Sequence, residues 1–140
     1  MKILLAADGS EYTKKALDFL TQHEQLLGED GELLVIHAQM LLPTIFASAI
    51  SVEKALEINE NAADEVFLPI KEFLEKHAIK HRCLSVIGSV AKEIVAAADN
   101  EGVRLILMGT HGRNAAASAL MGSVAQRVVA DSTVPVLLVK

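Results

Sequence analysis

The sequence predicts an α/β fold. Short runs rich in Ile, Leu and Val alternate with longer segments in which apolar residues recur at helical spacing, and the alternation ends in a strand. Such a pattern implies a mostly parallel sheet whose right-handed crossovers place helices on both faces. A chain of 140 residues suits one compact domain, which we expect to span residues 1–140.

Strands are expected where apolar runs are nearly continuous, because strands covered on both faces lose their alternation. These runs are Lys2–Ala7, Glu32–Ala38, Lys80–Ile87, Arg104–Met108 and Val134–Val139. Helices are expected where the apolar period is close to 3.6 residues, at Tyr12–Leu27, Val52–His77, Lys92–Glu101 and Ala119–Ala130. Ser10, Ser89 and Ser118 each precede a helical pattern and are expected N-caps.

Two segments do not fit a simple helix or strand. Pro69 falls inside the second helical pattern and predicts a kink or a break there. The segment Gln39–Ser51 is apolar but has no clear period. It is either a lid over a ligand, a contact with another chain, or a short core helix.

Composition excludes several classes of function. The net charge of −5 and the lack of a Lys/Arg cluster argue against nucleic-acid binding. The apolar runs are shorter than a membrane span, and no basic region precedes an apolar stretch at the start, so neither a membrane helix nor an export signal is expected. Cys83 is the single cysteine and is expected to be a buried structural thiol; a cytoplasmic location fits its inability to form an internal disulfide.

The pattern Gly109-x2-Gly112-x9-Gly122-Ser123 follows an apolar strand and indicates a phosphate-binding loop. Glycines permit close approach of an anion to the backbone and tolerate positive φ, and the helix after Gly122 supplies N–H donors with a positive dipole. The alternative is structural: Gly109 and Gly112 shape a strand-to-helix turn, and Gly122 permits close helix packing.

Polar residues follow the predicted strands where ligands bind in open α/β sheets. Asp8-Gly9-Ser10 follows the first strand, His37-Ala38 ends the second, and Gly109 to Arg113 follows the fourth. We expect a nucleotide site in which Asp8 bonds the base or ribose. Neither Gly-x-Gly-x-x-Gly nor Gly-x4-Gly-Lys-Ser/Thr is present. His37 and His111 are expected to be structural rather than metal ligands with Asp8, and His23, His77 and His81 are expected to face water.

Five segments together resemble the nucleotide-binding branch of the universal stress protein family, and the resemblance runs from end to end. They are Lys2–Ser10, Leu34–Ala38, Met108–Arg113, Gly122–Ala125 and Val134–Val139. The resemblance implies an adenine nucleotide alpha hydrolase-like fold, with a five-stranded parallel open sheet in the order 3-2-1-4-5. It also implies a homodimer through the last strand, which is an apolar edge strand that favours pairing with another chain.

The resemblance also implies roles for individual residues. Asp8 contacts adenine and Ala38 lines the base pocket, while Met108 and Gly109 flank the ribose. His111 and Gly112 begin the phosphate loop, which Gly122, Ser123 and Val124 complete. Beside Asp8 and Gly9, Ser10 either assists or caps a helix; Arg113 either pairs with a phosphate or lies in solvent. The linker 114–121 has no basic residue, and Ala38 is small, so both features predict weaker binding.

These features predict an ATP-binding regulatory protein of the stress response that acts as a homodimer, with Mg²⁺ carried by the nucleotide. One alternative is a slow ATPase or phosphotransferase that uses the same site. Another is a partner-binding module that binds no nucleotide. No acid/base pair or activated nucleophile can be assigned, so no catalytic residue is predicted.

Overall fold

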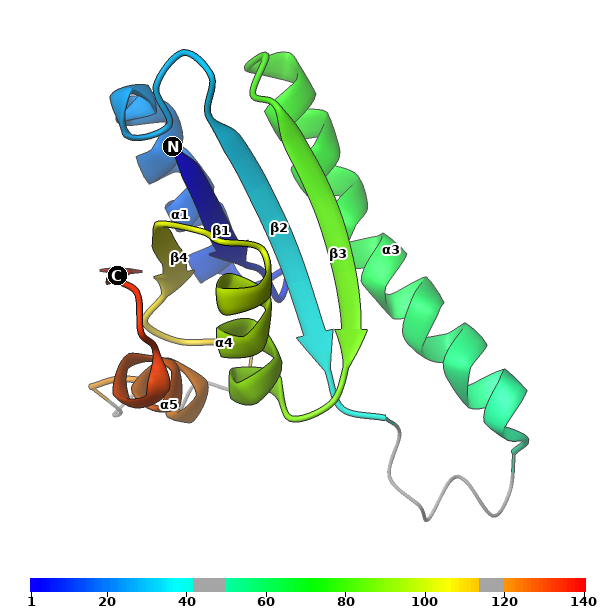
Figure 1. Ribbon diagram of the computed structural model, residues 1–140. Helices are drawn as coiled ribbons and strands as arrows, with labels where there is room; N and C mark the ends of the chain where they lie inside the picture. The colour runs from blue at the N-terminus through cyan, green and yellow to red at the C-terminus, as the bar shows by residue number, and fades with distance from the viewer. Residues whose placement is uncertain (42–49, 114–119) are drawn as a thin grey trace.

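The computed structural model describes residues 1–41, 50–113 and 120–140, and it confirms the α/β fold. Within these ranges, β1 (Lys2–Ala6), β2 (Glu32–Gln39), β3 (His81–Ile87), β4 (Leu105–Gly109) and β5 (Val136–Val139) form a five-stranded parallel sheet. Its order is β3-β2-β1-β4-β5, as the resemblance implies (Figure 1). The carboxyl ends of β1 and β4 therefore lie side by side at the point where the strand order reverses.

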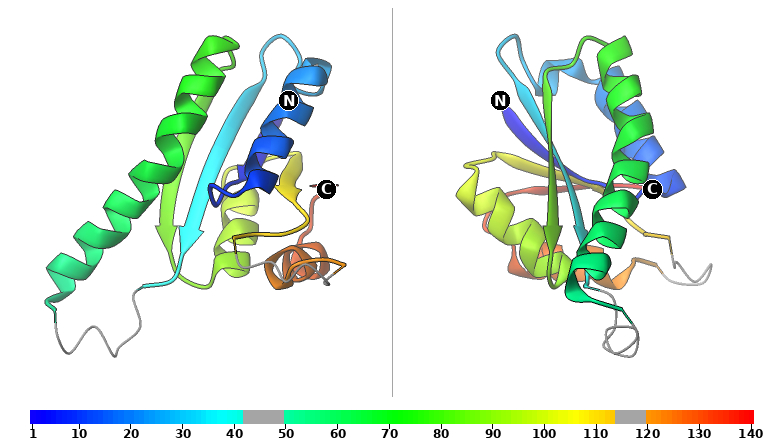
Figure 2. Two further views of the ribbon diagram at one scale, coloured as in Figure 1. Left: turned by 180° about the vertical axis from the view of Figure 1, so that it is seen from behind. Right: turned by 90° about the vertical axis from the view of Figure 1, so that its right-hand side faces the viewer.

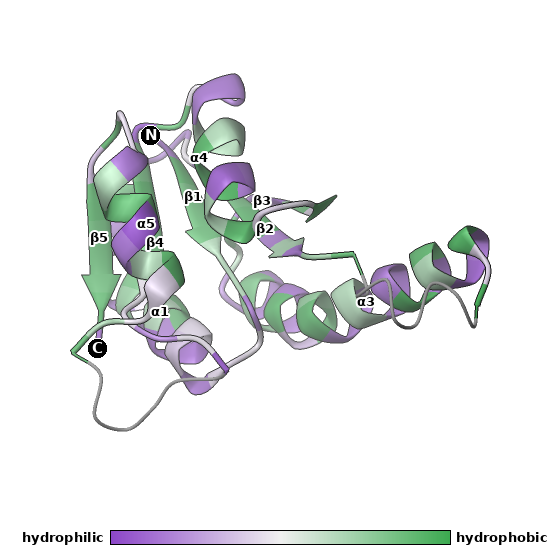
Figure 3. Ribbon diagram, turned by 90° about the horizontal axis from the view of Figure 1, so that it is seen from below, coloured by the Kyte–Doolittle hydropathy of each residue, from purple (hydrophilic) through white to green (hydrophobic). Residues whose placement is uncertain are grey.

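Helices cover both faces of the sheet, and the strand residues divide between them. α1 (Glu11–Gln22) and α3 (Val52–Lys76) pack on one face, while α4 (Val90–Asn100) and α5 (Ser123–Asp131) pack on the other (Figure 2). On β1, Ile3 and Leu5 join the first core and Leu4 joins the second, and all three are fully buried. β1, β4 and β5 are mainly hydrophobic (Figure 3), and β1 and β4 are largely buried because both of their faces are covered. The edge strand β3 is more polar, with several exposed residues.

Several predicted boundaries shift. The first helix ends at Gln22, and a short 3₁₀ helix, η1 (Glu24–Leu26), continues it. The last helix begins at Ser123 rather than Ala119, because Gly122 is extended (φ −69°, ψ 154°) and serves as its N-cap. Leu120, which the prediction placed in that helix, is 98% exposed.

The expected caps are only partly confirmed. Ser10 and Ser89 occupy the N-cap positions of α1 and α4, but neither side chain makes a capping hydrogen bond. Ser118 lies outside the described residues. Ser51 is a cap that the sequence reasoning missed: its hydroxyl accepts from the Lys54 N–H at 3.1 Å at the start of α3. Residues 42–49 of the ambiguous segment Gln39–Ser51 also lie outside the described residues.

Of the kink or break predicted at Pro69, the structure excludes the break. α3 continues through this residue from Val52 to Lys76. Pro69 lies on the exposed side of the helix, so the carbonyl that loses its usual N–H partner is accessible to water. The buried neighbours Val66, Phe67 and Ile70 hold the helix against the sheet on either side of the proline. No helix in the described residues is long and apolar enough to cross a membrane.

The burial of the cysteine and of two histidines differs from the prediction. Cys83 on β3 is half-buried rather than buried; burial raises the pKa of its thiol, with the charge of Lys71 opposing that rise. A raised pKa disfavours the thiolate, as expected of a structural cysteine. His77 is exposed as predicted, whereas His81 is half-buried. His23 does not simply face water, since it packs edge-on against Phe19 with ring centroids 4.3 Å apart.

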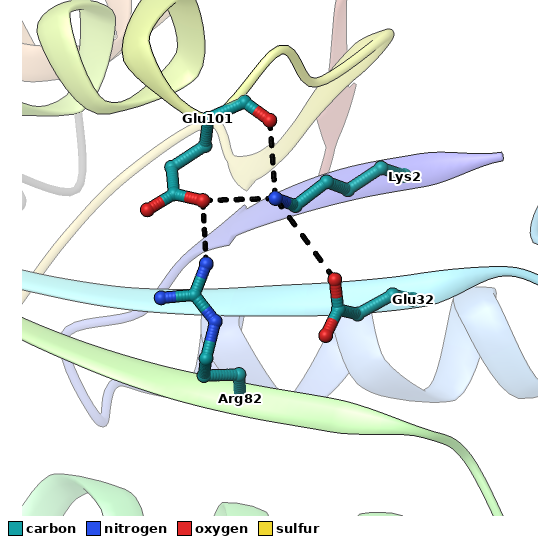
Figure 4. Close-up of polar contacts among 4 residues, drawn as sticks. All are labelled: Lys2, Glu32, Arg82 and Glu101. Carbon is teal, nitrogen blue, oxygen red and sulfur yellow. Dashed lines mark hydrogen bonds and ion pairs between the residues drawn. The ribbon is translucent and has the colours of Figure 1, made fainter.

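Charged residues join the amino ends of three strands to the end of α4 (Figure 4). The Lys2 ammonium donates to the Glu101 carboxylate at 2.8 Å and to its carbonyl at 3.0 Å, and lies 3.9 Å from Glu32. Arg82 on β3 pairs with the same Glu101 oxygen. These hydrogen bonds from Lys2 and Arg82 hold the pKa of Glu101 below its ordinary value. The network lies at the end of the sheet opposite the carboxyl ends of the strands.

We predict that Glu101→Gln lowers the melting temperature at pH 7. The lowered pKa of Glu101 stabilises the fold above the unfolded value of about 4.3, and this contribution is lost as the pH falls through the folded pKa. The difference from wild type should therefore shrink below about pH 4 and in high salt. Thermal unfolding followed by circular dichroism measures it. Glu57→Gln, which removes an exposed pair with Lys54, is the control; equal effects of both variants would contradict the prediction.

Candidate functional site

A cavity of about 480 Å³ opens at the carboxyl ends of β1, β2 and β4. It is lined by most of the residues predicted for the site, namely Asp8, Ala38, Met108, Gly109, His111, Gly112, Arg113, Gly122, Ser123 and Val124. Gly9 and Ser10 do not line it; they form the turn between Asp8 and α1. Residues far apart in the sequence therefore meet where the strand order reverses.

The Asp8 carboxylate connects the loop after β1 to the loop after β4. Its Oδ1 accepts the Ser10 N–H and the Thr13 hydroxyl, both at 2.9 Å. Its Oδ2 accepts the backbone N–H of Arg113 at 3.0 Å, across 105 positions of sequence. The Asp8 N–H in turn donates to the Thr13 hydroxyl oxygen at 3.1 Å.

These donors determine the charge state of Asp8. Burial raises the pKa of the Asp8 carboxyl, but the hydrogen bonds from Ser10, Thr13 and Arg113 together outweigh burial and hold the pKa below its ordinary value. Ionised Asp8 therefore stabilises the fold above the unfolded value of about 3.9, and that contribution is lost as the pH falls through the folded pKa. Asp8 is an anionic acceptor at neutral pH.

His37 anchors the end of β2 to the same region. It is 7% exposed, and its Nδ1 lies 2.8 Å from the Ala7 carbonyl oxygen. Since a carbonyl only accepts, Nδ1 carries the hydrogen. The ring meets Phe67 edge-on, with centroids 6.2 Å apart. This is the structural role that the sequence predicted for His37, and the described residues contain no group of three His, Cys, Asp or Glu side chains suited to hold a metal ion.

The two ends of the loop between β4 and α5 are hydrogen-bonded to each other. The Gly122 N–H donates to the Thr110 carbonyl at 2.8 Å, and the Thr110 N–H donates to Val139 on β5 at 2.9 Å. Thr110 is buried, and its hydroxyl oxygen lies 2.9 Å from Nδ1 of His111. The His111 ring packs against Tyr12 of α1, with centroids 5.1 Å apart. These contacts hold both ends of the loop at the wall of the cavity.

The glycines of the predicted phosphate loop are required by close packing, and not by an unusual backbone conformation. None of Gly109, Gly112 and Gly122 has positive φ, whereas Gly9 does, at 74°. A Cβ on Gly109 would overlap the Cβ of Tyr12, and one on Gly112 would lie 2.7 Å from Asp8 Oδ2. A Cβ on Gly122 would lie 3.3 Å from the Thr110 oxygen. Their small size therefore lets the loop close against α1 and Asp8, which supports the structural alternative for these residues.

The start of α5 faces the cavity through Ser123, Val124 and Ala125. Gly122, the N-cap, has no side chain, so it makes no side-chain hydrogen bond to the N–H groups of the first turn. Such N–H groups and the helix dipole favour an anion. Arg113 supplies a cation nearby: its exposed guanidinium lies over Gly9, 2.7 Å from where a Cβ would be.

Sequence reasoning missed part of the lining. The missed residues are Ala6, Ala7, Thr13, Ile36, Gln39, Ala62, Val90, Ile94, Thr110 and Ala125. Most are small or apolar, and no local pattern marks a wall residue contributed by a helix from elsewhere in the chain. Thr13 did leave a signal. It occupies the third position of α1, from which a side chain can reach back to the backbone before the helix.

Comparisons with known proteins agree with the fold. A universal stress protein of Thermus aquaticus is 35% identical over 138 residues, covering 99% of this chain and 97% of the relative. The solved protein MJ0577 of Methanocaldococcus jannaschii is 32% identical, with a TM-score of 0.84 and coverage of 99% and 94%. A family member from Arabidopsis thaliana, solved with AMP bound, shares the fold at 12% identity, with a TM-score of 0.71 and coverage of 100% and 91%.

The match extends over the whole chain. The sequence model of the universal stress protein family covers residues 1–140, from the first strand to the last. The segments on which the sequence resemblance rests include the strand ends that meet at the cavity. The chain therefore belongs to the universal stress protein family.

Proposed function

We propose that this protein binds ATP, or another adenine nucleotide, in the cavity at the carboxyl ends of β1, β2 and β4. The observation that supports this most is that one wall of the cavity is negatively charged and another favours an anion. Ionised Asp8 lies at one wall, and the start of α5, whose N-cap Gly122 makes no side-chain hydrogen bond, lies at another. A nucleotide offers hydrogen-bond donors on its base and ribose and negative charge on its phosphates, so its two ends match these two walls.

The proposed orientation follows from charge. The base and ribose lie towards Asp8, Ala38, Met108 and Gly109, and the phosphates lie towards the start of α5. His111, Gly112 and Arg113 extend the phosphate end, and the Ser123 hydroxyl and Gly122 to Val124 backbone meet the outer phosphates. The reverse orientation would place phosphates beside the Asp8 carboxylate, where like charges repel. AMP bound to the Arabidopsis thaliana family member supports an adenine nucleotide as the ligand class.

In this proposal Mg²⁺ is bound mainly by the phosphates of the nucleotide and not by protein side chains. Mg²⁺ prefers oxygen ligands and keeps several of its waters. Of the carboxylates, only Asp8 lines the described part of the cavity, and its oxygens already accept three hydrogen bonds. The Ser123 hydroxyl is the group we assign to the ion's vicinity. When bound, Mg²⁺ would screen phosphate charge.

The biological role that we propose is regulatory. Nucleotide occupancy would change the conformation or partner affinity of a homodimer in the stress response. The described lining offers no paired acid and base with an activated nucleophile, and the site is built for binding. The half-buried, unpaired Cys83 fits a reducing compartment, and we propose a cytoplasmic location.

The proposed dimer uses the open edge of β5. This strand pairs only with β4 within the described sheet, so one row of its backbone groups is free. Its four residues are half-buried and apolar. An exposed apolar edge invites pairing with a second strand, and a second copy of β5 supplies a self-complementary partner.

We predict that Gly122→Val abolishes or strongly weakens ATP binding. A side chain at this position pushes against Thr110 and His111 and opens the loop that lines the phosphate end of the cavity. Isothermal titration calorimetry with magnesium-ATP measures the effect, and we expect at least about a tenfold loss of affinity.

Gly88→Val is the matched control. Gly88 lies in the turn before α4, outside the cavity lining, and the atoms nearest to a Cβ there belong to the flexible side chain of Glu93. It should bind ATP as the wild type does. Equal heats from wild type and Gly122→Val would contradict the proposed site. Absence of binding in the wild type would favour a partner-binding module that uses no nucleotide.

We predict that Leu137→Lys shifts the protein from dimer to monomer. A charged side chain in the edge strand opposes pairing with a second copy, because two lysines would face one dry interface. Sedimentation velocity measures the mass, and circular dichroism confirms that the variant is folded. Leu137→Ala, which shortens the side chain without adding charge, is the control and should remain largely dimeric. A folded lysine variant that sediments as the wild-type dimer would contradict the proposal.

A further inference from the structure

Thr13 occupies an unusual position beside the proposed ligand site. It is 4% exposed, lies in the first turn of α1 and lines the cavity next to Asp8. Its hydroxyl oxygen accepts the Asp8 N–H at 3.1 Å, and its hydrogen is donated to Asp8 Oδ1 at 2.9 Å. A single buried hydroxyl therefore holds both the backbone and the side chain of the same aspartate.

The hydrogen bonds to Asp8 leave little freedom to the carboxylate. Each carboxylate oxygen has about two acceptor positions. Oδ1 uses both, on the Ser10 N–H and the Thr13 hydroxyl. Oδ2 uses one, on the Arg113 N–H. These three bonds leave an acceptor position on Oδ2, and the Ser10 hydroxyl is a further donor beside the carboxylate. A proton on Asp8 would compete with these donors, so the network favours the ionised form.

We infer that Thr13 is the positioning residue of the site, holding Asp8 in one rotamer as a hydrogen-bond acceptor for the ligand. The ligand group that meets Asp8 must then be a hydrogen-bond donor, such as an amine or a hydroxyl, and a carbonyl oxygen at that point is rejected. This assignment of the ligand rests on the proposed function. The state of Asp8 itself is independent of any ligand.

Thr13 acts within a group of other charged and titratable side chains. Those lining the cavity in the described residues are His37 on β2 and His111 and Arg113 after β4. The guanidinium of Arg113 lies over Gly9, and His37 bonds the Ala7 carbonyl. The hydrogen bonds of the Thr13 hydroxyl all go to Asp8, so the titration of Asp8 is the direct measure of removing that hydroxyl.

The test compares Thr13→Val with Thr13→Ser. Valine has nearly the shape of threonine but no hydroxyl, while serine keeps the hydroxyl. We expect Thr13→Val to raise the pKa of Asp8 by about one. The pKa is measured in the unliganded protein from the NMR signal of the Asp8 carboxyl carbon. Thr13→Ser should restore a value close to that of the wild type. Thr21→Val is the matched control. The Thr21 hydroxyl lies on the same helix but donates to the backbone carbonyl of Asp18 and makes no bond to Asp8.

ATP affinity is measured on the same proteins by calorimetry from pH 7 to pH 4. We expect Thr13→Val to bind about tenfold more weakly at pH 7, with a gap that widens as the pH falls, and Thr13→Ser and Thr21→Val to bind as the wild type does. If Thr13→Val does not fold, Thr13→Ala, which also lacks the hydroxyl, replaces it.

Two outcomes would overturn separate statements. An unchanged Asp8 pKa in Thr13→Val, or a serine variant that behaves like the valine variant, would overturn the role of Thr13 whatever the ligand. A wild-type protein that shows the expected Asp8 titration but binds no ATP would overturn the proposed function and leave the role of Thr13 in holding Asp8 established.

Discussion

The hydrogen bond between Asp8 and the backbone of Arg113 is the contact on which the site depends. It joins two loops that are 105 residues apart in sequence but follow strands that are neighbours in the sheet. The fit is close, because a side chain on Gly112 would already meet the Asp8 carboxylate. A carboxylate can make this connection because it accepts several backbone N–H groups at once, which neutral side chains of similar size do less strongly. The cavity is the space that this connection leaves between the strand ends.

The two ends of the sheet make different use of charge. At the amino ends, Lys2, Arg82 and Glu101 pair near the surface, where water screens their attraction and the contacts mainly align strands with α4. At the carboxyl ends, Asp8 is bonded to backbone N–H groups and a buried hydroxyl, and no charged side chain among residues 1–41, 50–113 and 120–140 forms an ion pair with it. An anion that is held but unpaired remains available to a ligand, whereas the charges at the opposite end are satisfied within the protein.

The sequence predicts the fold well because its evidence is distributed over many residues. Apolar runs such as Lys2–Ala6 are buried on both faces, so each strand is recognisable and each connection must be a crossover. Single positions are less predictable. Pro69 does not break its helix, because packing of its buried neighbours outweighs one missing hydrogen bond. The roles of Gly112 and Thr13 both depend on Asp8. Gly112 is far from Asp8 in the sequence and Thr13 is five residues from it, and no periodic pattern of residues predicts such contacts.

The glycine pattern correctly predicted residues that line the cavity, although the tolerance of glycine for positive φ is not what these positions use. Gly109, Gly112 and Gly122 are not in the left-handed region; they are small because Tyr12, Asp8 and Thr110 occupy the space that a Cβ would need. Close packing brings the loop against the end of β1. As a result, the start of α5 lies across the cavity from the ionised carboxylate of Asp8. In the proposed complex the same approach gives the ligand its direction, since the carboxylate accepts from donors and repels phosphates. Internal packing and ligand orientation are thus consequences of one arrangement.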